Sequence, residues 1–125
     1  MIENDEHWPL DQVLALAGSL DLPVVFDAFH HSLAPPVHPM RVREAVVAAA
    51  ATWAPEDGRP EVHFATQEPG KRPGAHARTL NLDAFARFVD EVGDLPLDCI
   101  LEVKDKEQSV LRVRQAGFAD GVDGE

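Results

Sequence analysis

Four short apolar segments of the chain each lead into a side chain that can bind a divalent metal. The side chains are Glu3, Asp27 with His30 three residues later, His63 and Glu102. Continuous apolar segments separated by amphipathic stretches are typical of buried strands in a parallel β/α sheet. The functional residues of such sheets lie at the carboxyl ends of the strands. We therefore expect these four strand ends to converge on one small region and to form a metal site.

The strands that would carry these residues alternate with amphipathic helices. We predict strands at residues 1–2 (a stub), 23–26, 61–65 and 98–103. Apolar residues at helical spacing predict helices over about 10–20, 41–53, 82–92 and 107–116. Loops rich in proline, histidine or glycine are expected over 30–40 and 66–79. The order β-α-β-α-β-α-β-α indicates the α/β class, and the glycine- and aspartate-rich residues 118–125 are expected to form a flexible tail.

The length of the chain favours part of a larger barrel over a complete small sheet. A whole (β/α)8 barrel, or TIM barrel, usually takes about 250 residues, and this chain has 125. We predict the C-terminal half of such a barrel, about four β/α units over residues 1–117, with a small open α/β sheet as the alternative. A half-barrel would leave unpaired strand edges and an uncovered apolar face. Its expected partner is therefore a missing N-terminal half-barrel or a second copy of itself.

Composition narrows the classes of function. Eleven basic and twenty-two acidic residues give a formal charge of −11, which argues against generic nucleic-acid binding through a basic surface. Bound metal ions could still supply positive charge locally. The single cysteine, Cys99, excludes an internal disulfide, fits a reducing compartment and is expected to be a buried, inert thiol. With no basic-then-apolar leader and no apolar run of bilayer length, we expect a cytoplasmic protein without a membrane partner.

Four motifs, taken in order and at their spacing, resemble the second half of the UV-damage endonucleases. They are Glu3-Asn4-Asp5-Glu6, residues 24–31 (VVFDAFHH), residues 62–64 (VHF) and residues 101–107 (LEVKDKE). The resemblance runs from the first residue to about Arg114. It implies a TIM-barrel DNA repair endonuclease that uses a cluster of divalent metals, typically manganese. Such an enzyme makes one nick on the 5′ side of UV photoproducts, so damaged double-stranded DNA is the implied partner of the full-length protein.

The resemblance also implies roles for individual residues. Glu3 and Glu102 match its catalytic, metal-binding carboxylates, Asp27 and His30 its Asp-x-x-His pair, and His63 a strand-end histidine. His76 is the candidate for a further histidine ligand, and the residues implied to support the metals or contact phosphate are His31, Glu61, Lys104 and Lys106. This ligand set suits Mn²⁺, with Zn²⁺ as the alternative. Metals about 3.5–4 Å apart activate water and stabilise both oxygens of an in-line phosphoryl displacement.

Two departures from the family pattern affect the expected activity. Glu61 stands where characterised members have a lysine modified to a carbamate, and the family's first half, with further histidine ligands and the damage-probing residues, has no counterpart here. We therefore expect little activity from the chain alone. The alternatives are another xylose isomerase-like, metal-dependent TIM barrel, or a catalytically silent half-barrel remnant. The strings around Asp27 and Glu102 favour the nuclease.

Overall fold

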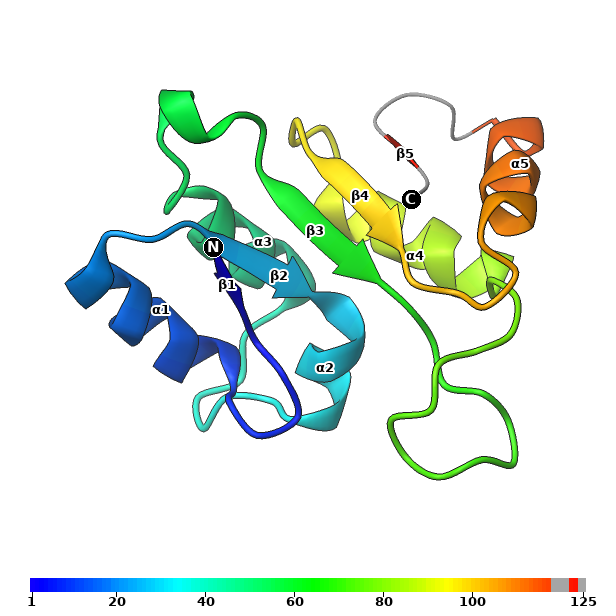
Figure 1. Cartoon of the computed structure of the whole chain (residues 1–125), viewed down its shortest axis with the longest axis horizontal. Helices are drawn as coiled ribbons and strands as arrows, with labels where there is room; N and C mark the ends of the chain where they lie inside the picture. The colour runs from blue at the N-terminus through cyan, green and yellow to red at the C-terminus, as the bar shows by residue number, and fades with distance from the viewer. Residues whose placement is uncertain (118–121, 124–125) are drawn as a thin grey trace.

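Five parallel strands form one sheet in which neighbours in the chain are neighbours in space (Figure 1). The computed structural model describes residues 1–117 and 122–123. The strands are β1 (Ile2–Glu3), β2 (Val24–Asp27), β3 (Glu61–Phe64), β4 (Asp98–Leu101) and β5 (Val122–Asp123). Parallel neighbours require crossover connections, and helices supply them here. The α/β class and the succession of about four β/α units are therefore confirmed, and the arrangement is consistent with part of a TIM-barrel-like fold.

Four of the five described helices lie close to their predicted positions, and α2 is the exception. The five helices are α1 (Leu10–Leu20), α2 (Ala28–Leu33), α3 (Val42–Ala50), α4 (Leu82–Val92) and α5 (Glu107–Gln115), with a short 3-10 turn at Pro55–Asp57. The Asn81 side chain caps α4 by accepting a hydrogen bond from Ala84 N at 3.0 Å. Gly93 ends α4 with a φ of 71°, and the Arg43 guanidinium lies so close that a Cβ there would clash with it. Among the described helices, none is both long and apolar enough to cross a membrane.

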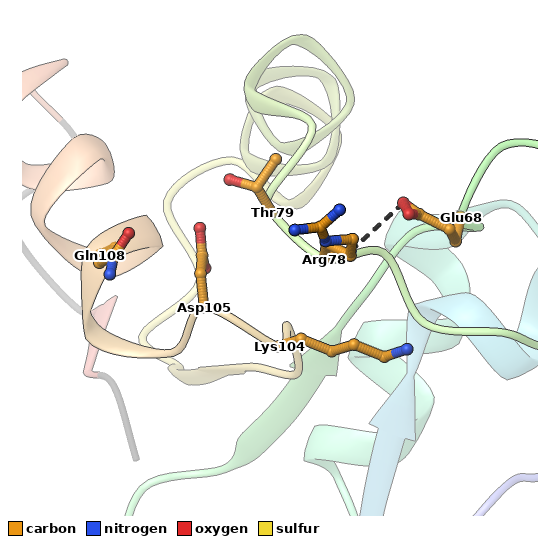
Figure 2. Close-up of a pocket in the computed structure, with 6 residues that line it drawn as sticks. All are labelled: Glu68, Arg78, Thr79, Lys104, Asp105 and Gln108. Carbon is orange, nitrogen blue, oxygen red and sulfur yellow. Dashed lines mark hydrogen bonds between the residues drawn. The ribbon is translucent and has the colours of Figure 1, made fainter.

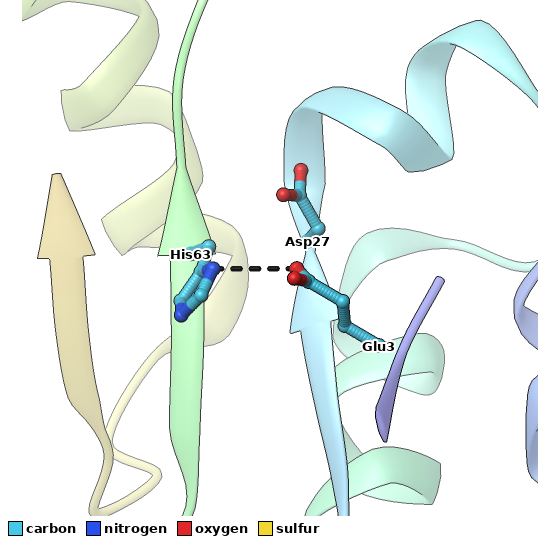
Figure 3. Close-up of side chains that lie close together, drawn as sticks. All are labelled: Glu3, Asp27 and His63. Carbon is cyan, nitrogen blue, oxygen red and sulfur yellow. Dashed lines mark ion pairs between the residues drawn. The ribbon is translucent and has the colours of Figure 1, made fainter. Parts of the chain in front are cut away.

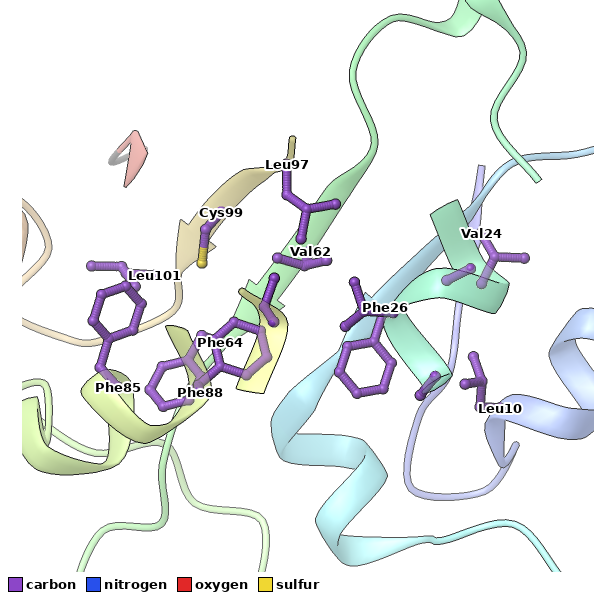
Figure 4. Packing of buried hydrophobic residues seen from close by; sticks show 14 of the residues in the cluster. Leu10, Val24, Phe26, Val62, Phe64, Phe85, Phe88, Leu97, Cys99 and Leu101 are labelled. Atoms are coloured by element: carbon purple, nitrogen blue, oxygen red, sulfur yellow. The ribbon is translucent and has the colours of Figure 1, made fainter. Parts of the chain in front are cut away.

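The hydrophobic core lies between the sheet and the helices α1, α3, α4 and α5. Of these, α3 and α4 are behind the strands in Figure 1. Phe26, Val62, Phe64, Cys99 and Leu101 face these helices and are buried (Figure 4). Phe64 packs against two aromatic rings of α4, with ring centroids 5.3 and 5.0 Å away. Burial raises the pKa of the Cys99 thiol to about 12, as expected for an inert core cysteine.

The opposite face of the sheet is polar where an apolar face was predicted. Successive side chains of a strand point to opposite faces, so Glu61 and His63 of β3 and Asp98 and Ile100 of β4 share this second face. Three of these four side chains are ionisable. The expectation of an uncovered apolar face is therefore wrong for β3 and β4, because this face carries the residues of the candidate site.

Two elements were not predicted. The six-residue helix α2 lies partly in the segment expected as a loop, and it begins there because the Asp27 carboxylate accepts a hydrogen bond from His30 N at 2.9 Å. Strand β5 pairs with β4 from within the predicted tail. Residues 118–121 and 124–125, the rest of that tail, lie outside the described residues, so its flexibility stays a prediction.

Candidate metal centre

Three side chains from three adjacent strands converge at the carboxyl end of the sheet. Glu3 ends β1, Asp27 ends β2, and His63 lies on β3, paired in register with Asp27. Each offers a ligand atom, and these atoms all lie within 4.8 Å of one another (Figure 3). The parallel arrangement brings these ends together although 60 positions separate Glu3 from His63. This is the convergence that the strand-end pattern predicts.

His63 lies among three carboxylates. Its Nδ1 is 3.3 Å from Glu3 Oε2 and 3.3 Å from Glu102 Oε1, and its Nε2 is 3.1 Å from Glu61 Oε2. Burial alone would lower the pKa of the ring, but the carboxylates of Glu102, Glu3 and Glu61 outweigh burial and raise the pKa of His63 to about 11. His63 in turn holds the pKa of Glu102 below its ordinary value. A proton on His63 therefore supplies the positive charge that these acids require.

Two buried atoms at this position fit a divalent cation. His63 Nδ1 and Glu102 Oε1 face each other without the geometry of a hydrogen bond, and within the described part of the chain neither has another hydrogen-bond partner. Buried polar atoms are normally paired. A divalent metal would satisfy both at once, and the mixture of carboxylate and imidazole donors suits a transition metal. The residues present are therefore compatible with a divalent metal.

Asp27 is held in place by its neighbours. It is fully buried, and burial is the main reason that the pKa of its carboxyl is raised to about 6, against the lowering effect of the hydrogen bond from His30 N. His30 Nδ1 lies 3.1 Å from Asp27 Oδ2 and 3.1 Å from the carbonyl oxygen of Asn4. The predicted Asp-x-x-His pair is therefore brought together, with His30 on the α2 side of Asp27.

Asn4 is a residue of the site that sequence reasoning missed. Its side chain is fully buried and hydrogen-bonds to both the backbone N–H and the carbonyl of Asp27. The available signal was a polar amide directly after the strand stub and beside Glu3. An amide side chain at a strand end can hydrogen-bond to the backbone of the neighbouring strand at the point where the backbone pairing of the sheet stops.

The remaining predicted residues surround this cluster at different distances. His76 packs against Phe29, with ring centroids 5.4 Å apart, and lines a hollow together with Glu102, Lys104 and Lys106. Both lysines are exposed. His31 lies elsewhere: its ring packs against Phe26 and its Nε2 is 3.2 Å from the Met40 carbonyl. The structure therefore places His31 in the packing around α2. Its supporting role at the metal centre stays a prediction.

An α/β sheet that gathers carboxylates and imidazoles at the ends of parallel strands defines a protein with a candidate metal centre. Comparison with known proteins narrows this class, because the family described as UV-endonuclease UvdE matches residues 1–122. The chain therefore belongs to the UV-endonuclease UvdE family. It superposes on the crystal structure of SacUVDE with a TM-score of 0.83 and 36% sequence identity, over 97% of this chain and 40% of that one.

Curated relatives cover the same region. The UV DNA damage endonuclease of Clostridium perfringens is 32% identical over 114 residues, and that of Deinococcus radiodurans is 30% identical over 117 residues. Each alignment covers 90% of this chain, but only 27% and 36%, respectively, of the relative's own length. The chain thus spans about a third of the length of the curated relatives it matches.

Proposed function

We propose that this chain supplies the metal-binding part of a DNA repair endonuclease that nicks damaged double-stranded DNA on the 5′ side of UV photoproducts. The observation that carries the proposal is the position of His63 Nδ1, 3.3 Å from carboxylate oxygens of both Glu3 and Glu102. Membership of the UV-endonuclease family supports the same reaction class. Mn²⁺ is the metal that we propose, and Zn²⁺ is the alternative.

The chain's own residues would bind the metal and orient its ligands. Glu3, Asp27, His63 and Glu102 are the proposed direct ligands, and His30, beside Asp27, and His76, which shares a hollow with Glu102, are proposed as further ligands. When bound, the metal would activate a water molecule and stabilise the oxygens of the phosphodiester in the displacement. Glu61 would accept a hydrogen bond from His63 Nε2, which fixes the ring so that Nδ1 faces the ligand carboxylates.

We propose that this chain contributes only part of the active enzyme. It spans about a third of the length of its curated relatives, and cleavage also needs a surface that holds the damaged duplex. A formal charge of −11 disfavours non-specific association with DNA, which depends largely on neutralising phosphates. We therefore expect little or no nicking by the 125-residue chain alone, even with Mn²⁺.

Conversion of supercoiled to open-circular plasmid tests the proposal. UV-irradiated plasmid is incubated with Mn²⁺ and the chain, with or without the N-terminal portion of a longer relative. Nicking should be negligible with either piece and measurable with both, and Glu102→Gln should abolish it. Glu107→Gln, a change at an exposed glutamate of α5, is the matched control and should leave nicking unchanged.

Two results would contradict the proposal in different ways. Robust nicking by the chain alone, lost in Glu102→Gln, would show that this third of the family's length is sufficient. Nicking by the two pieces that survives Glu102→Gln would show that the proposed centre does not carry out the reaction.

A further inference from the structure

The basic residues of this acidic chain are unevenly distributed. Five of its eleven lysines and arginines lie in the two loops that follow β3 and β4: Lys71, Arg72, Arg78, Lys104 and Lys106. All five are exposed. Among the residues that the structure describes, no carboxylate forms an ion pair with any of them, whereas Arg43 pairs with Asp94 and Arg59 with Asp98. The end of the sheet that carries the candidate metal centre therefore also carries unpaired positive charge.

The two loops are tied to each other. Lys104 N donates to Ala77 O at 3.3 Å, and Asp105 N donates to Arg78 O at 2.9 Å. The fully buried Ser109 reinforces this connection, because its hydroxyl accepts from Leu80 N at 3.0 Å and donates to the Asp105 carboxylate. The backbones that carry Arg78 and Lys104 are thus fixed relative to each other before any ligand binds.

The first of these loops is braced from within by Gln67. Its side-chain oxygen accepts from Gly74 N at 2.9 Å, and its side-chain nitrogen donates to the carbonyl of Arg72 at 2.8 Å. Gly74 has a φ of 94°, which the tight return of the loop requires. A loop closed in this way presents its cations at a lower entropic cost than a mobile loop would.

Two hollows share Lys104 as a lining residue, and one of them is also lined by Glu102 of the candidate metal centre. The first, of about 410 Å³, is lined by His76, Glu102, Lys104 and Lys106, among others. The second, of about 710 Å³, is lined by Glu68, Arg78, Thr79, Lys104, Asp105 and Gln108 (Figure 2). We call the second hollow the Arg78–Lys104 groove. Because Lys104 lines both hollows, the groove neighbours the hollow that Glu102 and His76 line.

The carboxylates of the groove are already engaged. Partial burial alone would raise the pKa of Asp105, but hydrogen bonds from Ser109 and Thr79 and the charge of Arg112 hold it below its ordinary value. The Glu68 carboxylate accepts a hydrogen bond from Arg78 N at 3.4 Å (Figure 2). The Arg78 guanidinium and the Lys104 ammonium are the two cationic groups of the groove, and no ion pair with a carboxylate is present among the described residues to occupy either of them.

We infer that the Arg78–Lys104 groove binds backbone phosphates of a nucleic-acid strand next to the position of the metal centre. The inference rests on the proposed function, which places a phosphodiester at that centre. Guanidinium groups match phosphate oxygens in a bidentate manner, and a lysine adds a point charge. Contacts of this kind position a strand and carry no base information. Binding in the groove should therefore be independent of sequence and of damage.

A titration without metal tests the groove by itself. The isotope-labelled chain is titrated at low ionic strength with a single-stranded octanucleotide, and backbone amide NMR shifts are followed because the net charge of −11 makes the affinity low. Shifts should concentrate in residues 66–79 and 102–108. Replacing both Arg78 and Lys104 by Ala should weaken binding about tenfold and reduce the slope of log K against log salt by about 1.4, two single-strand contacts.

The matched control removes the same amount of charge elsewhere. Arg87→Ala with Arg114→Ala neutralises two exposed arginines on the helices α4 and α5 and should change the affinity less than about twofold. Equal weakening by both double variants would overturn the inference, as would shifts outside the two loops or no binding by the parent chain. Equally tight binding of a glutamate octapeptide would overturn it in favour of a general site for acidic chains.

The result of this titration can be distinguished from the result of the test of the proposed function. No metal is present in the titration, so loss of the metal centre by Asp27→Ala would leave the binding of the oligonucleotide intact. If the chain binds metal but not the octanucleotide, the proposed function stands and the inference about the Arg78–Lys104 groove is wrong.

Discussion

Asn4 and Asp27 form a reciprocal pair of hydrogen bonds in which the Asn4 side chain acts as the neighbouring strand would. Asn4 Nδ2 donates to Asp27 O at 3.0 Å, and Asp27 N donates to Asn4 Oδ1 at 2.8 Å. The ladder between β1 and β2 ends one step earlier, at Glu3 and Val25. The side chain of Asn4 therefore extends the pairing to the residue whose carboxylate enters the metal centre.

Replacing Asn4 by Ala should affect both stability and metal affinity. Two buried backbone groups of Asp27 would lose their partner, which costs about 1–3 kcal/mol in the free energy of unfolding. Because Asp27 would be held less firmly, Mn²⁺ affinity should also fall. Asn81→Ala is the control, since it removes the cap of α4 and costs about 1 kcal/mol without touching the centre. Urea unfolding and calorimetry measure the two effects, and unchanged Mn²⁺ affinity in Asn4→Ala would contradict this role.

Glu61 should orient His63 rather than act only through its charge. Its Oε2 lies 3.1 Å from His63 Nε2, on the side of the ring opposite Glu3 and Glu102. Glu61→Ala should therefore lower Mn²⁺ affinity about 10- to 100-fold, as other partners of metal-binding histidines do, and Glu61→Gln should restore part of the loss. The register partner of Glu61 on β4 is Asp98. An equal loss in Asp98→Ala would show that charge on this face, not orientation, is responsible.

Metal binding should release protons in a pH-dependent number. The pKa of His63 is raised to about 11, so at pH 8 the ring is protonated in the free chain and must lose one proton to become a ligand. The pKa of Asp27 is raised to about 6, so below pH 6 its carboxyl also gives up a proton. Release should rise from about one proton at pH 8 towards two at pH 5, and affinity should fall with decreasing pH. Calorimetry in buffers of different ionisation enthalpy measures the number, and no release at pH 8 would refute the His63 assignment.

Self-association should involve the α1 side of the sheet. The outer edge of β1 is unpaired among the described strands, and Leu16 and Leu20 of α1 are about half exposed. We expect sedimentation to show species larger than a monomer, reduced by Leu16→Ser with Leu20→Ser but not by Leu111→Ser, a similarly exposed leucine of α5. A compact monomer with a strong near-UV signal from Trp8 and Trp53 would contradict this expectation.

The sequence was sufficient to predict the helices whose apolar side chains face the core. The predicted helices 10–20 and 82–92 are observed with the same bounds, because their apolar residues recur at helical spacing. The helix expected over 41–53 ends at Ala50, where Thr52 and Trp53 turn back to hydrogen-bond with Val24. Helix α2 was missed because one capping bond and the tertiary contacts of Phe29 and His31 stabilise it, which local periodicity does not reveal.

The candidate site was predictable to the extent that it depends on strand ends. Glu3, Asp27 and His63 meet because parallel pairing aligns the ends of β1, β2 and β3. Contacts made across loops were not predictable in the same way. The role of Asn4 depends on which backbone its side-chain amide contacts. Arg78 and Lys104 are held near each other by backbone hydrogen bonds from Lys104 to Ala77 and from Asp105 to Arg78.

Calorimetric titration with Mn²⁺ tests the central claim most directly. The parent chain should bind the metal weakly but measurably, and Asp27→Ala with His63→Ala should remove that binding. His38→Ala with Asp90→Ala, a change of the same composition at exposed positions, should leave it unchanged, with circular dichroism confirming that each variant is folded. A folded Asp27→Ala, His63→Ala variant that binds Mn²⁺ as tightly as the parent would show that the metal centre is not at these strand ends.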